Sequence, residues 1–185
     1  GQGRPLHLED FHRKTGLRGA VMSAVDLING LGRAAGMTVL HAEGITGLLD
    51  TNYEGKVQAA MDFLDSGGDF VFLHVEAPDE CGHAGNMEDK IESIQRFDAR
   101  VVQPLYQRYG QTDAVFCIAC DHLTPLEVRT HVPEPVPFLL YWNGCHLCAG
   151  LSVFTEATAA NTGLVIEPGH TLLDWIVRTT GGRQA

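Results

Sequence analysis

Acidic and imidazole side chains gather in two short motifs whose donor atoms are typical of metal sites. The first motif, residues 76–83, follows an apolar segment and places Asp79 and His83 four residues apart, with Gly82 between them. A tight turn or a single helical turn would aim both side chains at one ion. The same spacing is also typical of two solvated loop residues, so spacing alone leaves both interpretations open.

The second motif consists of Asp121 and His122, which directly follow the strongly apolar segment 114–120. His131 comes nine residues later, shortly before the next apolar segment. If the strands of the sheet are parallel, both motifs lie at its carboxyl edge, where open α/β sheets bind their ligands. A short loop would return His131 to this edge, although a histidine in such a place is more often a hydrogen-bonded loop residue.

Together the motifs offer five oxygen or nitrogen donors, from Asp79, His83, Asp121, His122 and His131. Such a mixed set suits Mn²⁺ or Zn²⁺ better than Ca²⁺, which prefers a shell of oxygen atoms. Two ions are feasible, and five donors would leave coordination positions open. A pair of ions with open positions can hold the attacking and leaving oxygens of a phosphoryl transfer, so the motifs point to this chemistry.

The elements that must position these donors alternate between strand-like and helix-like segments. This order favours an α/β fold with a mainly parallel sheet covered by helices on both faces. The candidate N-caps are Asp26 for the first of these helices, Asp50, Thr51 or Asn52 for the second, and Asn86 for the longest. Pro104 is expected to kink the last turn of the longest helix. The predicted strands span 19–25, 37–42, 69–76, 113–120 and 136–142, and the predicted helices span 26–36, 53–65, 86–110 and 171–180.

Composition narrows the classes of partner. The 185 residues suit one globular domain, and 44% hydrophobic residues with 19% charged residues exclude a disordered chain. Acidic residues number 23 against 13 basic ones, and the net charge of −10 has the wrong sign for binding nucleic acid or an anionic membrane. A small anionic substrate remains feasible, because a bound dication would reverse the local sign of the charge.

Hydropathy predicts neither a membrane span nor a signal peptide. The longest apolar run, residues 114–120, is far shorter than the ~18 residues of a transmembrane helix. The first thirty residues hold charged side chains and no apolar block of the kind that a secretory signal requires. The cytoplasm is therefore the expected compartment.

Two motifs are discounted. Cys117 with Cys120, and Cys145 with Cys148, have the spacing of a zinc ribbon, but the first pair lies in a predicted strand, where residues three apart point to opposite faces. The five cysteines are instead expected to be thiols outside any disulfide, mostly buried. Residues 30–35 match a dinucleotide-binding fingerprint formally, but they leave too few residues for the helix that should follow.

Lys56 is a candidate for binding the phosphate of a substrate. It lies near the start of a predicted helix beside Asn52, where a basic side chain and unpaired backbone amides could hold an anion. The alternative, an ordinary solvent-facing lysine, is the one that we favour on the sequence alone.

Four segments resemble a known family. They are residues 47–56, 74–85, 121–125 and 129–138, and they occur in the family's order. The sequence is similar to the archaeal-type, cofactor-independent phosphoglycerate mutases of the alkaline phosphatase superfamily, and the resemblance covers nearly the whole chain. It implies a three-layer αβα sandwich with an alkaline phosphatase-like core.

The resemblance implies interconversion of 3-phosphoglycerate and 2-phosphoglycerate through a phosphoserine intermediate, with two divalent ions that are usually manganese. It assigns Asp79, His83 and His131 to one ion, and Asp121 with His122 to the other. The small phosphorylated substrate would be the principal partner. An exposed sheet edge would also make self-association feasible.

The sequence departs from the family in its nucleophile. The family's second ion also takes an aspartate near the N-terminus and a nucleophilic serine, and neither motif is present here. The four serines, Ser23, Ser66, Ser93 and Ser152, all lie outside a matching context. We therefore expect residues 1–185 to be the C-terminal part of the core of a longer enzyme, without its N-terminal part and cap domain, and to be inactive alone.

Two alternatives stay open at this point. The same metal core also serves other phosphatases and phosphotransferases, so the substrate need not be phosphoglycerate. The chain could also be a metal-binding or interaction module without catalysis. If the chain is instead the expected part of a mutase, we expect weak metal binding at Asp121 and His122, because the remaining ligands of that ion are absent.

Overall fold

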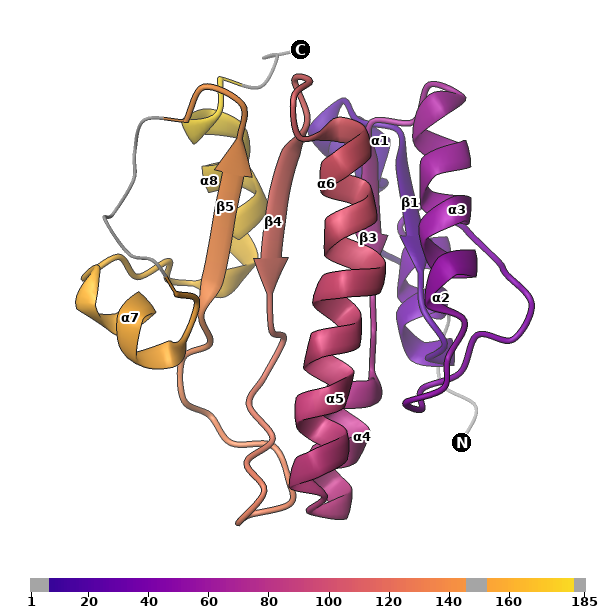
Figure 1. The fold of residues 1–185 in the computed structure, drawn as a ribbon. Coiled ribbons are helices and arrows are strands. Elements are labelled where there is room, and N and C mark those ends of the chain that lie inside the picture. The colour runs from indigo at the N-terminus through magenta and orange to yellow at the C-terminus, as the bar shows by residue number, and fades with distance from the viewer. Residues whose placement is uncertain (1–6, 146–152, 182–185) are drawn as a thin grey trace. The chain divides into compact units, whose positions relative to one another are not determined.

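The computed structural model describes residues 7–145 and 153–181, and the chain divides into two units between Leu105 and Tyr106. The helix α6 (Gln103–Tyr109) crosses this boundary. The first unit contains α1 (Phe11–Thr15), β1 (Gly19–Met22), α2 (Asp26–Ala34), β2 (Thr38–Val39), α3 (Tyr53–Asp65), β3 (Phe70–Leu73), α4 (Ala77–Ala84), α5 (Met87–Phe97) and the π-helical η1 (Asp98–Val102) (Figure 1).

A parallel sheet in the order β2-β1-β3 forms the centre of the first unit. In its register Val21 pairs with Phe72 and Met22 with Leu73, so these two pairs point to opposite faces. The helix α2 covers the face of Val21, where a Cβ added at Gly32 would clash with the Val21 side chain. This close approach explains why a glycine stands inside α2, and it shows that residues 30–35 form no dinucleotide-binding turn.

The opposite face of the sheet carries the main hydrophobic core. Tyr53 and Val57 of α3 and Val101 of η1 are buried together, and Leu73 and Val75 pack against them. All four residues of β1 are buried because helices cover both of its faces. The α/β fold and the layered arrangement expected from the sequence are therefore confirmed in this unit.

The helix boundaries follow the predicted caps in two of three places. The Asn52 Oδ1 atom accepts a hydrogen bond from Gly55 N, and the Asn86 Oδ1 atom accepts one from Asp89 N. The prediction for Asp26 is wrong, because α2 begins at that residue and Val25 occupies the cap position without a side-chain hydrogen bond.

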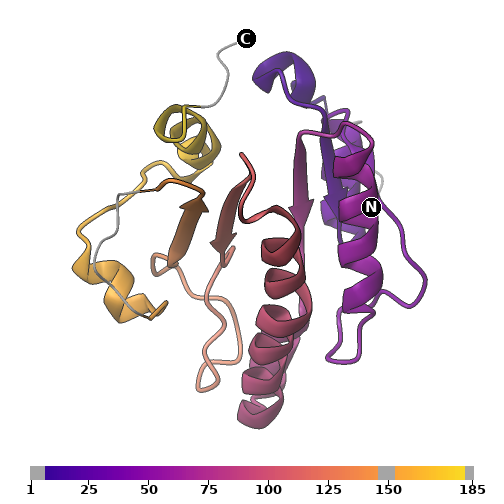
Figure 2. The ribbon, with the colours of Figure 1, turned by 45° about the horizontal axis from the view of Figure 1, so that its top comes forward.

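The longest helical run combines α5, η1 and α6 without interruption (Figure 1, Figure 2). Pro104 does not simply kink its last turn. The wider π-helical turn of η1 ends immediately before Gln103, whose N–H donates to the Asp98 carbonyl five residues back. Pro104 has no N–H to give to the preceding turn, and the π turn is how the backbone accommodates this loss.

The second unit is built around β4 (Val115–Ala119) and β5 (Phe138–Trp142), which pair antiparallel. The expectation of a mainly parallel sheet therefore applies to the first unit and not to this pair. The Tyr141 ring contacts the rings of Tyr106 and Phe116. The remaining described elements are α7 (Glu156–Asn161), the 3₁₀ turn η2 (Gly169–Thr171) and α8 (Leu172–Thr179).

The cysteines correct one further expectation. None of the four described cysteines forms a disulfide, as predicted, but only Cys81 is buried, whereas Cys117 and Cys120 are exposed and Cys145 is partly exposed. Cys148 lies outside the described residues. Across residues 7–145 and 153–181, every helix is too short or too polar to cross a lipid bilayer.

Candidate metal centre

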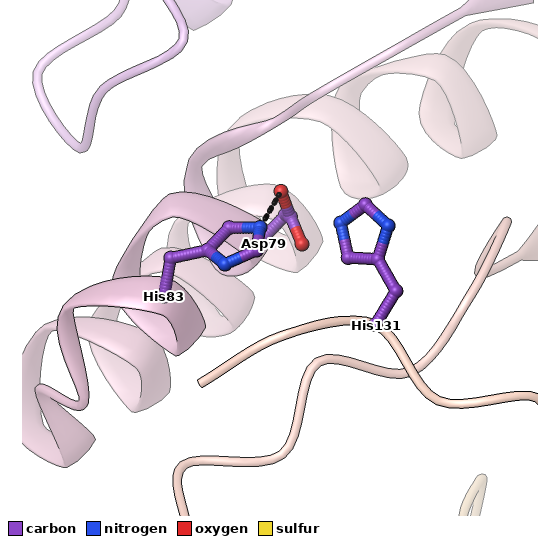
Figure 3. A group of neighbouring side chains, drawn as sticks. All are labelled: Asp79, His83 and His131. Atoms are coloured by element: carbon purple, nitrogen blue, oxygen red, sulfur yellow. Dashed lines mark ion pairs between the residues drawn. The ribbon is translucent and has the colours of Figure 1, made fainter. Parts of the chain in front are cut away.

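The first pair of candidate ligands, Asp79 and His83, lies on a single turn of α4 (Figure 3). The two residues are separated by one helical turn, so their side chains share a face of the helix. The Asp79 Oδ2 and His83 Nε2 atoms are 3.3 Å apart, and both side chains are partly exposed. The structure therefore places Asp79 and His83 on a helical turn, and not in a loop.

Local sequence explains why α4 begins and ends where it does. Pro78 lies in the first turn, where backbone N–H groups have no partner within the helix, so its lack of an N–H costs no hydrogen bond. Asp79 adds a negative charge near the positive end of the helix. The N–H groups of Asp79 and Glu80 donate to the Glu76 carbonyl. Gly85 ends the helix at a φ of 70°, a conformation that favours glycine.

The second group of candidate ligands belongs to the second unit and lies on the connection between β4 and β5. The Asp121 Oδ2 and His122 Nε2 atoms are 3.4 Å apart, directly after the end of β4. The ring centroids of His122 and His131 are 3.6 Å apart, with the rings nearly parallel. The three residues are therefore neighbours, although nine positions separate the two histidines.

Antiparallel pairing is what returns His131 to His122. The end of β4 and the start of β5 lie at the same end of the two-stranded ladder, and the connection is closed by a bridge between Leu123 and Val132. The Val132 N–H donates to the Leu123 carbonyl at 3.1 Å. Backbone pairing therefore brings together the two segments that carry His122 and His131, whose rings stack.

Thr124 orients the His122 ring, a contact that the sequence analysis missed. This threonine is buried, and its Oγ1 atom lies 3.2 Å from His122 Nδ1. For Nε2 to bind a metal, the ring proton must reside on Nδ1, where Thr124 Oγ1 can accept it. The position two residues after the histidine is the only signal in the sequence, and threonine at such a place is too common to be diagnostic.

The turn that leads to His131 contains a residue in the left-handed region. Arg129 has a φ of 57°, and its N–H donates to the Pro125 carbonyl at 2.8 Å. A non-glycine residue in this region costs of order 1 kcal/mol, and such residues cluster near functional sites. The strained turn is therefore a second feature that fixes the approach of the chain to His131.

The donor geometry within each unit fits a transition metal. Two ligand atoms bonded at about 2.1 Å to a tetrahedral ion lie about 3.4 Å apart. The carboxylate–imidazole pairs, Asp79 with His83 and Asp121 with His122, have atom separations of 3.3 and 3.4 Å. Each pair therefore has a separation compatible with one bound ion, although a carboxylate–imidazole ion pair has the same separation.

Lys56 is not the solvent-facing lysine favoured on sequence. Its side chain is 0% exposed, and its Nζ atom donates to the His74 carbonyl at 3.0 Å. Burial lowers the pKa of Lys56, and the negative charge of Glu76 opposes this shift. Contact of Lys56 with a substrate stays a prediction, and its buried position favours another role.

The described serines occupy structural positions. Ser23 and Ser93 are both 0% exposed, and Ser93 Oγ donates to the Lys90 carbonyl. Ser66 Oγ donates to the Phe63 carbonyl at the end of α3. A hydroxyl buried as deeply as those of Ser23 and Ser93 cannot meet a substrate phosphate in this conformation. Ser152 lies outside the described residues.

Comparison with protein families gives one match that spans most of the chain. Residues 2–170 match the metalloenzyme superfamily. The chain is 46% identical over 96% of its length to a probable 2,3-bisphosphoglycerate-independent phosphoglycerate mutase of Geobacter sulfurreducens. It is 44% identical over 96% of its length to the 2,3-bisphosphoglycerate-independent phosphoglycerate mutase of Methanothrix thermoacetophila. The chain spans 44% and 45% of the length of these two relatives.

Solved structures give the same result for the fold. A protein of Pyrococcus horikoshii matches 96% of this chain with a TM-score of 0.87 at 31% identity, and the match covers 53% of that protein. The cofactor-independent phosphoglycerate mutase of Thermoplasma acidophilum matches 94% of this chain with a TM-score of 0.71 at 26% identity, and the match covers 40% of that enzyme.

Proposed function

Because the chain belongs to the metalloenzyme superfamily, we propose that it forms part of a 2,3-bisphosphoglycerate-independent phosphoglycerate mutase. The observation that carries the proposal is the similarity of nearly the whole chain to relatives with this name. The two carboxylate–imidazole pairs support it, because each already has the atom separation that suits a divalent ion. The enzyme class is therefore an isomerase that moves a phosphoryl group within its substrate.

The proposal assigns the donors to two ions. Asp79, His83 and His131 would hold one ion, and Asp121 with His122 would hold the other. Manganese is the proposed metal, with zinc as the alternative, because carboxylate and imidazole donors suit both. Bound ions would supply positive charge to the phosphoryl oxygens. Bound ions would also offset locally the negative net charge of −10, which disfavours an anionic substrate.

The proposed substrate is 3-phosphoglycerate, converted to 2-phosphoglycerate through a phosphoserine. In this scheme the serine oxygen takes the phosphoryl group from one hydroxyl of the glycerate and returns it to the other. We propose that the serine is none of the four in this chain, so residues 1–185 alone should not turn over phosphoglycerate. The cytoplasm as compartment and self-association stay predictions.

A chimera tests this proposal. The region of the Geobacter sulfurreducens relative that aligns with this chain is replaced by residues 1–185, and ³¹P NMR follows 3-phosphoglycerate in the presence of Mn²⁺. We expect 2-phosphoglycerate to form with the chimera and not with the chain alone. His83→Ala in the chimera should lower the rate at least about 100-fold, because removing a ligand should cost more than the 10–100-fold typical of outer-shell changes.

The same spectra distinguish the competing functions. Release of inorganic phosphate in place of 2-phosphoglycerate would identify a phosphatase. A chimera that folds and binds Mn²⁺ but leaves 3-phosphoglycerate unchanged would contradict the proposed reaction. His12→Ala, an exposed histidine on α1, is the matched control and should leave the rate unchanged.

A further inference from the structure

His74 is held at both its side chain and its backbone by buried polar groups. Its Nδ1 atom lies 3.0 Å from the Ser23 Oγ atom, and its carbonyl accepts a hydrogen bond from Lys56 Nζ at 3.0 Å. Ser23 and Lys56 are both 0% exposed. We call these three residues the His74 clasp. It joins the end of β1, the first turns of α3 and the end of β3, all within the first unit.

The clasp fixes the short connection that leads from β3 into α4. His74 is the first residue after β3, and Glu76 is the N-cap of α4. The Glu76 carbonyl accepts hydrogen bonds from Asp79 N and Glu80 N, so the position of this connection sets the start of the helix. Asp79 lies in that first turn, and His83 follows one turn later. A shift at His74 would therefore move both metal donors of α4.

Gly47, in the loop before α3, also lies close to the connection. A Cβ added at Gly47 would lie 2.6 Å from the Glu76 Oε2 atom, so there is no room for a side chain at Gly47 beside this carboxylate. The Glu76 charge also acts on Lys56, whose pKa it raises against the larger lowering caused by burial. The connection therefore meets Lys56 at the His74 carbonyl and Gly47 at the Glu76 carboxylate.

Burying a lysine in this space is energetically unfavourable. Taking an ammonium group out of water costs several kcal/mol, and an apolar side chain of similar volume is often neutral or stabilising at such a site. Lys56 nevertheless directs its ammonium group to one main-chain carbonyl. A role in stability alone does not account for this choice, whereas a role in fixing one backbone conformation does.

We propose that Lys56 is a positioning residue that holds the His74–Glu76 connection and thereby orients Asp79 and His83 for metal binding. The inference rests on the proposed function for the identity of the site. It replaces the predicted contact between Lys56 and a substrate phosphate, because the ammonium group is directed to the backbone. It also assigns Ser23 to the clasp, since its buried hydroxyl is hydrogen-bonded to His74.

Hydrogen exchange of the metal-free chain tests the positioning role without relying on metal binding. Lys56→Met keeps most of the side-chain volume and removes the donor. We expect amides 75–84 to exchange about 10-fold faster in this variant, while β1 and α2 keep their protection, because the change is local. Lys56→Arg, which retains a donor, should restore part of the protection.

A control separates positioning from general stability. Gly32→Ala forces a Cβ against Val21 on the other face of the sheet and should lower the melting temperature without selective exchange at 75–84. Mn²⁺ affinity, measured by calorimetry, should fall about 10-fold in Lys56→Met, as for outer-shell groups generally. It should change little in Gly32→Ala at a temperature where both variants are folded.

Each outcome decides between the inference and its alternatives. Unchanged exchange at 75–84 in Lys56→Met, or a uniform rise throughout the first unit, would overturn the positioning role. If Lys56→Met does not fold, Gly47→Ala displaces the Glu76 carboxylate and should give the same selective exchange, and its absence would equally overturn the inference. Failure of the wild-type chain to bind Mn²⁺ would instead count against the proposed function alone, since the exchange result does not need the metal.

Discussion

The two groups of candidate ligands are positioned by different means. In the first unit, Asp79 and His83 are neighbours because they lie one turn apart on α4, and eight consecutive residues form that helix. In the second unit, His122 and His131 are neighbours because β4 and β5 pair antiparallel and the Leu123–Val132 bridge closes their connection. One geometry is local in sequence, and the other depends on contacts between separated segments.

This difference determines how each group should respond to change. A helix retains the spacing of residues four apart as long as the turn itself persists. The loop group, which consists of Asp121, His122 and His131, depends on the strained turn at Arg129 and on the contact with buried Thr124. Several separate interactions must therefore remain intact. We therefore expect metal binding to be more sensitive to changes around the loop than to changes at the ends of α4.

Removing His131 should have the largest effect on the affinity for Mn²⁺. If this loop residue completes the ligand set of the α4 pair, His131→Ala should weaken Mn²⁺ binding at least about 100-fold, as expected for a direct ligand. Calorimetric titration measures the change, and His170→Ala, an exposed histidine on η2, is the matched control. Equal affinities in the two variants would show that the α4 pair binds its ion without the loop.

Thr124 tests the support of the loop group. Thr124→Val keeps the shape of the side chain but removes the hydroxyl that lies 3.2 Å from His122 Nδ1. We expect the affinity of the ion at Asp121 and His122 to fall about 10-fold, the lower end of the range for outer-shell contacts. An undiminished second binding step in the titration would show that Thr124 is structural only.

Gly85 tests the independence of the helical group. Gly85→Ala places a Cβ at a φ of 70° and should destabilise the first unit by about 1 kcal/mol. Chemical denaturation measures this loss. Mn²⁺ affinity should stay within about 2-fold of the wild type, because the turn between Asp79 and His83 is unchanged. A large loss of affinity would mean that the helical pair is not locally determined.

The pH dependence of stability gives the smallest expected effect. Burial lowers the pKa of Lys56, so between this lowered value and the ordinary value of 10.5 the unfolded chain binds more protons than the folded chain. The free energy of unfolding of the wild type, relative to Lys56→Met, should therefore rise as the pH increases from about 7 towards 10.5. Urea denaturation of both proteins at several pH values measures the difference, and a fall would contradict the buried charge.

The local features were those that the sequence predicted well. A single helical turn is one of the arrangements that the spacing of Asp79 and His83 allows, and the caps Asn52 and Asn86 are among the candidates that the sequence offers. These features depend on interactions within about four residues, which can be read directly from the order of side chains. Asp26 was an exception, because Val25 occupies the cap position.

The non-local features could not be predicted in the same way. The sequence does not indicate that β4 and β5 pair antiparallel, because short apolar segments are also typical of buried parallel strands. The sequence predicts a surface position for Lys56, because lysine is almost never fully buried unless it is paired. Its partner, the His74 carbonyl, comes from a different part of the chain and is not evident from the residues around Lys56. The position of Thr124 beside His122 likewise depends on the loop conformation.

A titration of residues 1–185 with Mn²⁺, comparing the wild type with His83→Ala and His12→Ala, tests the central claim most directly. We predict saturable binding in the wild type and in His12→Ala, and loss of the binding step assigned to Asp79, His83 and His131 in His83→Ala. Binding that is absent from the wild type, or that is equally strong in His83→Ala, would contradict a metal centre built on Asp79 and His83.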